Sequence, residues 1–532
     1  MHVESPTVPP AQDGADRPAE RGPRSNPWLS LIAVSFGLFM VALDGTVVAI
    51  ANPYIGQDLG TSLSQLQWVT NSYLLALAAL LVLGGKLGDR FGRKKFFLIG
   101  LVGFTLTSAA IGLVGSIGGV IFFRALQGAF GALLMPNTLG ILRAVFPPKK
   151  FGRAVGIWAM VSSVSTALGP IVGGALVEHV GWEWVFYINV PIGVIGFLYG
   201  MYVLSENRNS TGRHRFDVPG VVLLAAGMIA LVYGIVKGET WGWGDARTLG
   251  MIVLGLAVLV VFGLVENRTE HPLLPMRLFR NPSLTAGTAI TAINFFALIG
   301  TIFFVMLYLQ NVRGYSPITA GVLTLPLSLA SVVAAPLGAS LTERFGPRVT
   351  MPTGMLLQAA ASCSFLFLDV DSSYNLMWPA FICMGLGVGA VMAASSEAIV
   401  GNAPVRDAGV AGGLQATALQ LGGALGTSIL LSVLSLRAAS AVGGQFASAG
   451  VPAELAAGLE PHAKETVAMG VAPVPDGVSA RVAAAVTDAS GQAFMQGVHA
   501  AVAVSGTLCL LGAVLAVAVV RRGRPADSVP MH

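Results

Sequence analysis

Charged side chains are scarce in this sequence. Only 11% of the 532 residues are Asp, Glu, Lys or Arg, whereas 54% are hydrophobic. A soluble chain carries about 25% charged residues, because its surface must be solvated by water. The composition therefore argues against an ordinary soluble protein and predicts one that is dissolved in lipid.

Cysteine is also rare, and the three cysteines form no recognisable site. Cys363, Cys383 and Cys509 lie in separate apolar runs, far from any cluster of His and Cys. An odd number of isolated cysteines disfavours both a disulfide framework and a zinc site. We therefore predict no metal site.

The sequence lacks the motifs of nucleotide-driven pumps and of intramembrane enzymes. It contains no Gly-x-x-x-x-Gly-Lys-[Ser/Thr] loop and no soluble segment large enough to hydrolyse a nucleotide. An intramembrane enzyme, the alternative from another functional class, would need a metal or nucleophile constellation such as His-Glu-x-x-His, and none occurs. We therefore predict a protein that is not an enzyme and has no cofactor, with an ion gradient as its energy source.

Long apolar runs fill the chain from Trp28 onward. Residues 1–27 are polar and predict a disordered cytoplasmic tail rather than a signal peptide. Each later run has the length of about 20 residues that crosses a bilayer as a helix, and backbone polar groups must be paired within a helix there. The prediction is an all-α polytopic membrane protein with fourteen spans, at residues 28–51, 66–86, 96–115, 119–143, 154–177, 184–204, 218–236, 247–265, 284–309, 317–341, 350–368, 377–400, 409–436 and 493–520.

The positions of the basic residues agree with this count. With both termini in the cytoplasm, 24 of the 31 lysines and arginines fall on the cytoplasmic side. Such a bias is what the positive-inside rule expects, and one span more or fewer in the middle would destroy it. The net charge of +5 therefore reflects membrane topology rather than nucleic-acid binding. We predict a multi-pass protein of the cytoplasmic membrane.

One charged loop occurs twice. Residues 85–95 read G-K-L-G-D-R-F-G-R-K-K, and residues 338–348 read G-A-S-L-T-E-R-F-G-P-R. Aligned on Arg-Phe-Gly, Asp89 matches Glu343, and each copy follows the second helix of a six-helix set. Two parallel halves around a binding site that opens alternately to each side are a transporter architecture. The predicted division is an N-terminal bundle at 28–204, a linker with two extra helices at 205–283, a C-terminal bundle at 284–520 and a cytoplasmic tail at 521–532.

These motifs resemble the major facilitator superfamily, and the fourteen spans resemble its drug:proton antiporter branch of the EmrB/QacA type. The loop at 85–95 resembles motif A, and Leu43–Val48 resembles the first-helix motif of that branch. Residues 124–131 resemble motif B, and Gly169–Gly174 resemble motif C of antiporters. The sequence departs from the family pattern at three positions, which are Ala49, Ser165 and Glu183.

Asp44 and Arg124 are the predicted proton-coupling residues. Asp44 lies about 15 residues into its helix, or roughly 22 Å from its start, where a carboxylate costs about 2.5–3.5 kcal/mol and needs a partner or a cavity. The alternative is a residue that caps the outer end of the helix. Arg124 is the only basic residue deep in a predicted span, and the resemblance implies a role in proton transfer. Its alternative is a structural ion pair or hydrogen bonds to backbone carbonyls.

Two gating elements are predicted. In motif A, Asp89 is expected at the N-terminus of a neighbouring helix, with arginines paired to carboxylates as a cytoplasmic latch; the alternative is simple positive-inside topology. The second copy, with Glu343 and Pro347, is expected to form a weaker latch.

In motif C, the Gly-Pro sequence predicts a kinked hinge against the other half, or else ordinary small-residue packing. The predicted residues are Gly85, Asp89, Arg90, Gly92 and Arg93 of motif A, and Gly169, Pro170, Gly173 and Gly174 of motif C.

A few further polar residues are candidates. Glu397 is either an interfacial residue or a second carboxylate reachable from the cytoplasm, and the predicted outer loop at 437–492 has no assignable task. Possible cavity-lining residues are Gln67, Asn71 and Asn137.

The function predicted from these features together with the resemblance is a monomeric antiporter that exports hydrophobic or amphipathic small molecules in exchange for protons. The alternative among transporters is a proton-coupled importer or exporter of one specific metabolite.

Overall fold

The computed structural model describes residues 26–60, 63–206, 217–270, 272–475 and 477–520. Every regular element in this part of the chain is helical, so the all-helical prediction is confirmed. The predicted tails lie outside the described residues, except that α1 already begins at Pro27. The α-helices are α1 (Pro27–Asp58), α2 (Leu63–Phe91), α3 (Arg93–Leu113), α4 (Ile117–Val145), α5 (Pro148–His179), α6 (Trp184–Tyr187), α7 (Asn189–Val203), α8 (Val218–Trp241), α9 (Ala246–Glu266), α10 (Pro282–Leu307), α11 (Pro317–Phe345), α12 (Pro347–Phe365), α13 (Tyr374–Ser396), α14 (Ala408–Ser448), α15 (Ala453–Thr466) and α16 (Ala480–Val519).

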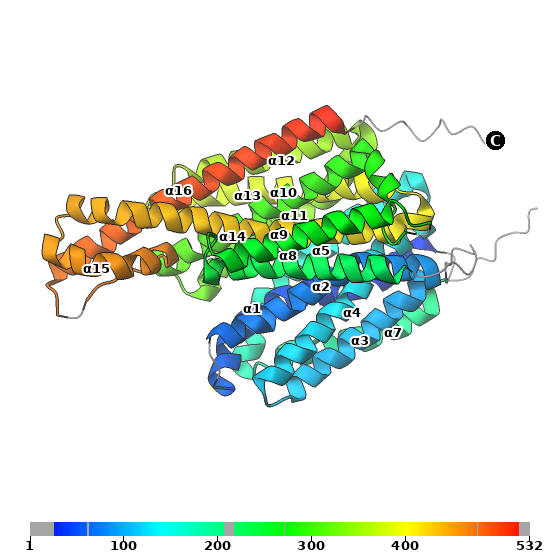
Figure 1. The fold of residues 1–532 in the computed structure, drawn as a ribbon, viewed down its shortest axis with the longest axis horizontal. Helices are drawn as coiled ribbons and strands as arrows, with labels where there is room; N and C mark the ends of the chain where they lie inside the picture. Colours follow the sequence, from blue (N-terminus) through cyan, green and yellow to red (C-terminus); the bar gives the residue numbers. More distant parts are fainter. Residues whose placement is uncertain (1–25, 61–62, 207–216, 271, 476, 521–532) are drawn as a thin grey trace, which may run out of the picture.

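The helices form two bundles joined by a helical hairpin (Figure 1). The first bundle contains α1–α7, and the second contains α10–α14 and α16. The hairpin of α8 and α9 packs through α8 against α2 of the first bundle and α14 of the second. The two bundles meet mainly where α2 packs on α14 and where α5 packs on α11.

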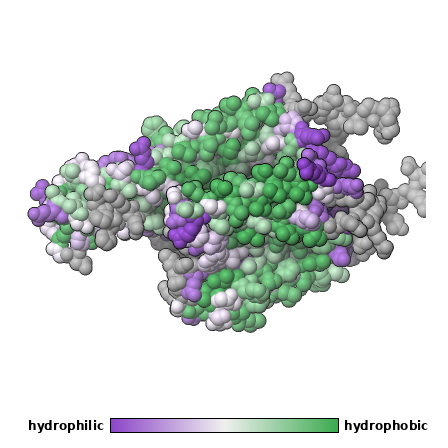
Figure 2. Space-filling view, in the orientation of Figure 1, coloured by the Kyte–Doolittle hydropathy of each residue, from purple (hydrophilic) through white to green (hydrophobic). Residues whose placement is uncertain are grey.

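The surface has the character of a membrane protein. Among the described residues, thirteen helices are long and apolar enough to cross a membrane. Figure 2 shows a broad hydrophobic surface over the bundles, with hydrophilic residues gathered toward both ends. The predicted span at 350–368 forms helix α12 and packs between α13 and α16, but it is not among those thirteen. Its place in the bundle is compatible with the fourteen predicted spans.

The duplicated loop forms the same turn in both bundles. Gly92 separates α2 from α3 with a φ of +117°, and Gly346 separates α11 from α12 with a φ of +80°. Both backbone conformations are readily adopted only by glycine. The Arg-Phe-Gly sequence therefore marks a tight turn between two consecutive helices in each half.

The predicted outer loop at 437–492 is largely helical. Helix α14 has 41 residues and α16 has 40, so each is about 60 Å long and twice as long as the roughly 30 Å hydrocarbon core of a bilayer. Their ends, together with α15, project beyond the other helices at the left of Figure 1. This helical arm contacts the π-helical turn η3 (Tyr308–Val312), directly after α10, where Asn311 Nδ2 donates a hydrogen bond of 2.6 Å to the Met469 carbonyl.

Candidate functional site

Asp44 and Arg124 meet in the interior of the first bundle. Asp44 lies in the middle of α1 and Arg124 in α4, and both side chains are almost fully buried. Arg124 Nη1 is 2.6 Å from Asp44 Oδ2. Because α1 continues to Asp58, Asp44 does not cap a helix end, and that alternative is wrong.

Three further polar groups complete the surroundings of this ion pair, which we call the Asp44 cluster. Gln127 Nε2 donates to Asp44 Oδ1 at 3.1 Å, and Gln127 Oε1 accepts from Arg124 at 2.7 Å. Asn189 Nδ2 reaches Asp44 Oδ1 at 3.4 Å, and Arg124 Nε donates to the Val69 carbonyl at 3.1 Å. The guanidinium also lies 4.1 Å from the centre of the Tyr73 ring, within the range of a cation–π interaction.

The sequence indicated only part of this cluster. Gln127 shares a helical face with Arg124 at i+3 spacing, which signals a common environment. Nothing in the sequence spacing of Asn189 points to Asp44, because α7 reaches Asp44 only through tertiary packing. Tyr73 on α2 carried no signal at all. The alternative interpretation of Arg124 is a structural ion pair or hydrogen bonds to backbone carbonyls. Both contacts are present, since Arg124 pairs with Asp44 and donates to the Val69 carbonyl.

Asp89 joins the two bundles at the end of the molecule where α1 begins. Its carboxylate accepts hydrogen bonds of 3.0 Å from the backbone N–H groups of Gly409 and Val410. These are the first residues of α14 after Ala408, so the carboxylate sits at the positive end of a helix of the other bundle. The sequence predicts this placement. We call the contact between α2 and α14 the gate, and this end of the molecule the gate end.

Glycine allows the two helices of the gate to approach closely. A Cβ on Gly85 would lie 2.2 Å from the Gly409 carbonyl oxygen. Any larger residue at Gly85 would therefore push α2 away from α14.

Arg93 extends the gate contact. It is hydrogen-bonded to Asp89 at 2.7 Å, and it donates to the carbonyls of Gly140 and Val405. Arg93 therefore binds one carboxylate of its own loop and one backbone carbonyl of the other bundle. Arg90 lies 4.9 Å from the Phe91 ring. The predicted pairing with a carboxylate is observed for Arg93, whose partner Asp89 belongs to the same loop.

The second copy of the loop makes a related but smaller contact. Glu343 on α11 accepts a hydrogen bond of 3.0 Å from the Arg153 N–H in the second turn of α5. Glu343 is exposed, whereas Asp89 is buried. The acidic residue of each loop therefore contacts the beginning of a helix in the opposite bundle, with Asp89 making the more buried contact.

Motif C packs within its own bundle. A Cβ on Gly169 would lie 1.9 Å from Thr46 Oγ1 on α1, two residues from Asp44. Gly173 is buried, whereas a Cβ on Gly174 would meet no atom within 4 Å. The side chain of Pro170 lies outside the described residues. The expected contact of motif C with the other half is therefore wrong for Gly169, which packs on α1 of its own bundle. Helix α5 contacts α11 of the other bundle at positions before motif C, where Ser163 and Ser331 are hydrogen-bonded at 3.1 Å.

The other polar residues predicted as candidates, Glu397 and the possible cavity-lining residues, do not lie together in one site. Glu397 opens a π-helical turn, η4 (Glu397–Gly401), and its buried Oε2 has no hydrogen-bond partner. Asn137 is fully buried and donates to the carbonyls of Gly84 and Leu133, so it holds α2 against α4 rather than lining open space. Asn71 is half-buried, and the Gln67 side chain lies outside the described residues. No group of three His, Cys, Asp or Glu side chains in the described ranges could hold a metal ion.

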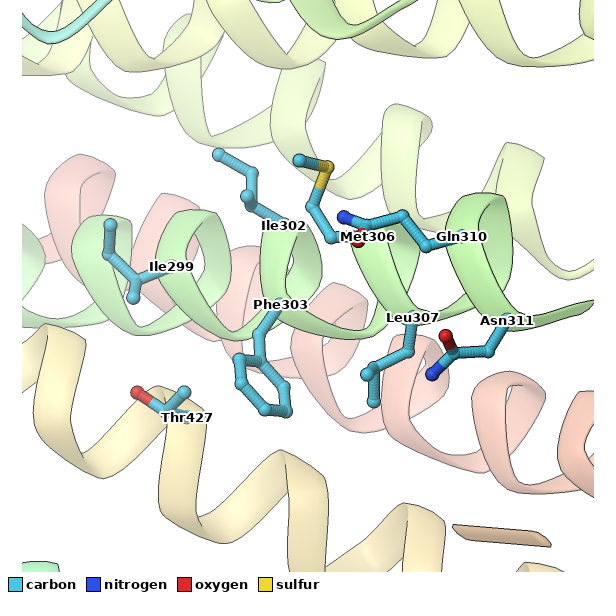
Figure 3. Close-up of a pocket in the computed structure, with 8 residues that line it drawn as sticks. All are labelled: Ile299, Ile302, Phe303, Met306, Leu307, Gln310, Asn311 and Thr427. Carbon is cyan, nitrogen blue, oxygen red and sulfur yellow. The ribbon is translucent and has the colours of Figure 1, made fainter. Parts of the chain in front are cut away.

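An apolar pocket lies in the second bundle. It has a volume of about 290 Å³ and is formed by one face of α10, by Gln310 and Asn311 in the π-helical turn η3 (Tyr308–Val312), and by Thr427 of α14. In Figure 3, Phe303 and Leu307 point toward the helix that carries Thr427, and the two amides lie at one end of the row. An apolar wall with a few polar groups is the usual composition of a small-molecule site.

Comparison with known proteins identifies the fold. The sequence model of the Major Facilitator Superfamily matches residues 34–427. The protein belongs to this superfamily. The human organic anion transporter MFSD10 (TETRAN) has the same fold, with a TM-score of 0.59, 12% sequence identity and coverage of 92% of this chain and 99% of that one. This major facilitator protein is therefore a multi-pass membrane transporter, and its predicted membership of the superfamily is confirmed.

Several curated relatives resemble this superfamily member over most of its length. The "Tetracenomycin C resistance and export protein" of Streptomyces glaucescens is 44% identical over 512 residues, which are 96% of this chain and 94% of that protein. The "Puromycin resistance protein pur8" of Streptomyces alboniger is 36% identical, covering 78% and 83%. The "Multidrug efflux pump LfrA" of Mycolicibacterium smegmatis is 33% identical, covering 93% and 96%.

Proposed function

We propose that this transporter exports hydrophobic or amphipathic small molecules across the cytoplasmic membrane in exchange for protons. The observation that carries the proposal is the Asp44 cluster, a titratable carboxylate held by Arg124 inside the bundle. Such a charge is costly within a membrane and marks an ion pathway or proton relay by default. The gate end is the cytoplasmic side in this proposal, because the basic residues of the loops gather there.

The cluster supports proton coupling through its geometry. Asp44 is an acceptor for Arg124, Gln127 and Asn189, all of which stabilise its charged form. A proton on Asp44 would remove the negative charge and weaken all three contacts at once. Because α1, α4 and α7 meet at this carboxylate, its protonation is linked to how these helices pack.

Motif C connects the carboxylate to the rest of the bundle. Thr46 lies two residues beyond Asp44 and fills the space that Gly169 leaves open on α5. Helix α5 also contacts α11 of the other bundle. A shift of α1 on protonation of Asp44 would therefore be passed through Gly169 to the interface between the bundles.

The closed gate supports an alternating mechanism. In this structure Asp89 and Arg93 hold α2 against α14, so the predicted cytoplasmic side is shut. A transporter that captures its substrate from the cytoplasm must break these contacts in the other half of its cycle. They consist of a few hydrogen bonds at a helix terminus, which can be exchanged for hydrogen bonds to water.

The apolar pocket on α10 supports an apolar substrate. Its wall is made of Ile, Phe, Met and Leu side chains, and the neutral amides of Gln310 and Asn311 supply the polar contacts. No carboxylate is among the residues that line it, which fits a neutral or weakly charged aromatic compound rather than a dication. The relative at 44% identity is named for tetracenomycin C, which makes this compound the first substrate to test.

The proposal can be tested with everted membrane vesicles. Vesicles that contain the protein should accumulate an aromatic substrate when a proton gradient, acidic inside, is imposed, and an uncoupler should stop the accumulation. Substrate addition should also release protons from the vesicles. A protein that instead moves substrate in the same direction as protons would be an importer, and this proposal would be wrong.

A further inference from the structure

A second pair of acidic side chains lies far from Asp44 in the sequence, where the α8–α9 hairpin meets the gate end. Asp217 caps the beginning of α8 by accepting a hydrogen bond of 2.9 Å from the Gly220 N–H. Glu266 is the last residue of α9 and is only 2% exposed. One of its oxygens, Oε2, accepts a hydrogen bond of 3.1 Å from the Leu274 N–H.

The other oxygens of the two carboxyl groups face each other. The position of a Cβ on Gly220 would lie 2.2 Å from Glu266 Oε1 and 2.5 Å from Asp217 Oδ2. Both of these oxygens are buried, and neither has a hydrogen-bond donor within the described part of the chain. Two ionised carboxylates in this arrangement would repel each other, and both would lack partners. A single proton shared between the oxygens removes the repulsion and gives each oxygen a hydrogen-bond partner.

The charged groups around the pair favour one proton rather than none. Among the described residues, the cation that faces Glu266 is Lys86 on α2, and the anion that faces it is Asp217. Lys86 also faces the acids Asp89 and Asp407, as well as the base Arg90, so its charge is shared among several acids. One proton on Asp217 and Glu266 leaves a single negative charge, rather than two, for the shared charge of Lys86 to compensate.

The segment beside the pair crosses the gate. Residues 272–280, which we call the strap, run from the end of the hairpin toward α10. Lys86 Nζ on α2 donates a hydrogen bond of 2.6 Å to the Pro272 carbonyl. Arg277 forms an ion pair of 2.9 Å with Asp407, directly before α14. The strap is thus bound to both helices of the gate, and its Leu274 is bound to Glu266.

We propose that Asp217 and Glu266 form a second proton-binding site, separate from Asp44, that holds the strap in place while the gate is closed. When the proton is lost, the two carboxylates repel each other and attract the Lys86 ammonium group. Lys86 then leaves the Pro272 carbonyl, and the strap no longer ties α2 to α14. The site lies at the gate end and exchanges its proton with the compartment on that side, so acid in that compartment keeps the gate closed. This regulation goes beyond the proposed export function, because a proton-driven exporter would then slow down when the cytoplasm is already acidic.

The first experiment looks for the proton itself. Infrared difference spectra of the purified protein in liposomes are recorded while the pH is changed from acid to alkaline. Wild type should show a protonated-carboxyl C=O band that disappears on alkalinisation and is missing in Glu266→Gln and Asp217→Asn. Glu270→Gln is the matched control, since Glu270 is an exposed acid four residues after Glu266. Identical spectra for Glu266→Gln and Glu270→Gln would overturn the proposal.

The second experiment follows the gate. Spin labels at Lys95→Cys and Val405→Cys, both exposed and on opposite sides of the gate, report its opening as a distance. Cys363 and Cys383 are replaced by alanine, and Cys509 is fully buried. Wild type and Glu270→Gln should gain the longer distance at alkaline pH. Glu266→Gln should keep the short one, because its amide can donate permanently to Asp217.

The same measurement in Asp44→Asn separates this site from the export mechanism. The gate should still respond to pH through Asp217 and Glu266 even if Asp44→Asn stops transport. A pH response that is lost in Asp44→Asn but kept in Glu266→Gln would show that Asp44 controls the gate and that the second site does not exist. Failure of export by the wild-type protein would leave this pH response unaffected.

Discussion

Arg124 Nη1 lies 2.6 Å from Asp44 Oδ2, and neither side chain is more than about 1% exposed. Each residue is the counterion of the other, so the two charges form one electrostatic unit that spans α1 and α4. Removing either charge alone leaves its partner buried without compensation, which costs about 3–5 kcal/mol in comparable buried pairs. A substitution at one of these positions therefore affects both stability and coupling.

Asp44→Asn should abolish concentrative efflux, since an amide cannot bind and release a proton at this position. Substrate-induced proton release from proteoliposomes should vanish with it. The thermal unfolding temperature should fall, because Arg124 loses its counterion. The matched control is Asp44→Asn combined with Arg124→Gln, which should recover much of the stability but no transport. Concentrative export by Asp44→Asn with an unchanged dependence on the pH gradient would show that the proton site lies elsewhere, and Glu397 would be the next residue to test.

Asp89→Asn should slow turnover more than Glu343→Gln. Asp89 is buried and binds two N–H groups at the start of α14, whereas Glu343 is exposed and binds one on α5. Hydrogen bonds to a charged group contribute about 1.5–3 kcal/mol, so the loss of charge at Asp89 should raise the open population of the gate several-fold. Spin-label distances across the gate measure this population directly. Equal effects of the two substitutions would mean that the second loop closes the molecule as strongly as the first.

Gly169→Ala should impair transport, while Gly174→Ala should not. The added methyl group at position 169 would lie 1.9 Å from Thr46 Oγ1, but the same group at position 174 would meet nothing within 4 Å. Overpacking of this kind costs about 1–3 kcal/mol, and here it displaces α1 next to Asp44. Transport rates at equal amounts of membrane-inserted protein give the comparison. If both alanine variants transport normally, the contact between α5 and α1 is not part of the mechanism.

Phe303→Ala should weaken export of aromatic substrates by raising the apparent KM with a smaller effect on kcat. The ring is part of the pocket wall on α10, and it offers a flat apolar surface to an aromatic compound. Leu254→Ala is a suitable control, because this residue is exposed on the outer face of α9, away from the pocket. Competition between an aromatic and an aliphatic substrate should show a change of preference in the Phe303 variant alone. An unchanged preference would place substrate binding outside this pocket.

The sequence by itself determined the architecture, because each part of it rests on local physical chemistry. A helix that crosses a bilayer needs about 20 apolar residues, and this length is visible in the sequence wherever it occurs. The bias of basic residues predicts an orientation for the whole chain, and the duplicated Arg-Phe-Gly loop locates the equivalent helices of the two halves. Asp44 and Arg124 were likewise recognisable one at a time, since an ionisable residue inside an apolar run is rare and must have a partner.

Only the tertiary structure decided which of these residues are partners. Asp44 and Arg124 are 80 residues apart, and Asp89 and Gly409 are 320 apart, so no spacing rule connects them. The same holds for Asn189, for the contact of Gly169 with Thr46, and for Asp217 facing Glu266 across the missing side chain of Gly220. In lipid, apolar side chains give helices little preference for one neighbour over another. The pairing of helices therefore depends on small residues and buried polar groups that must fit several neighbours at once, and that fit exists only in three dimensions.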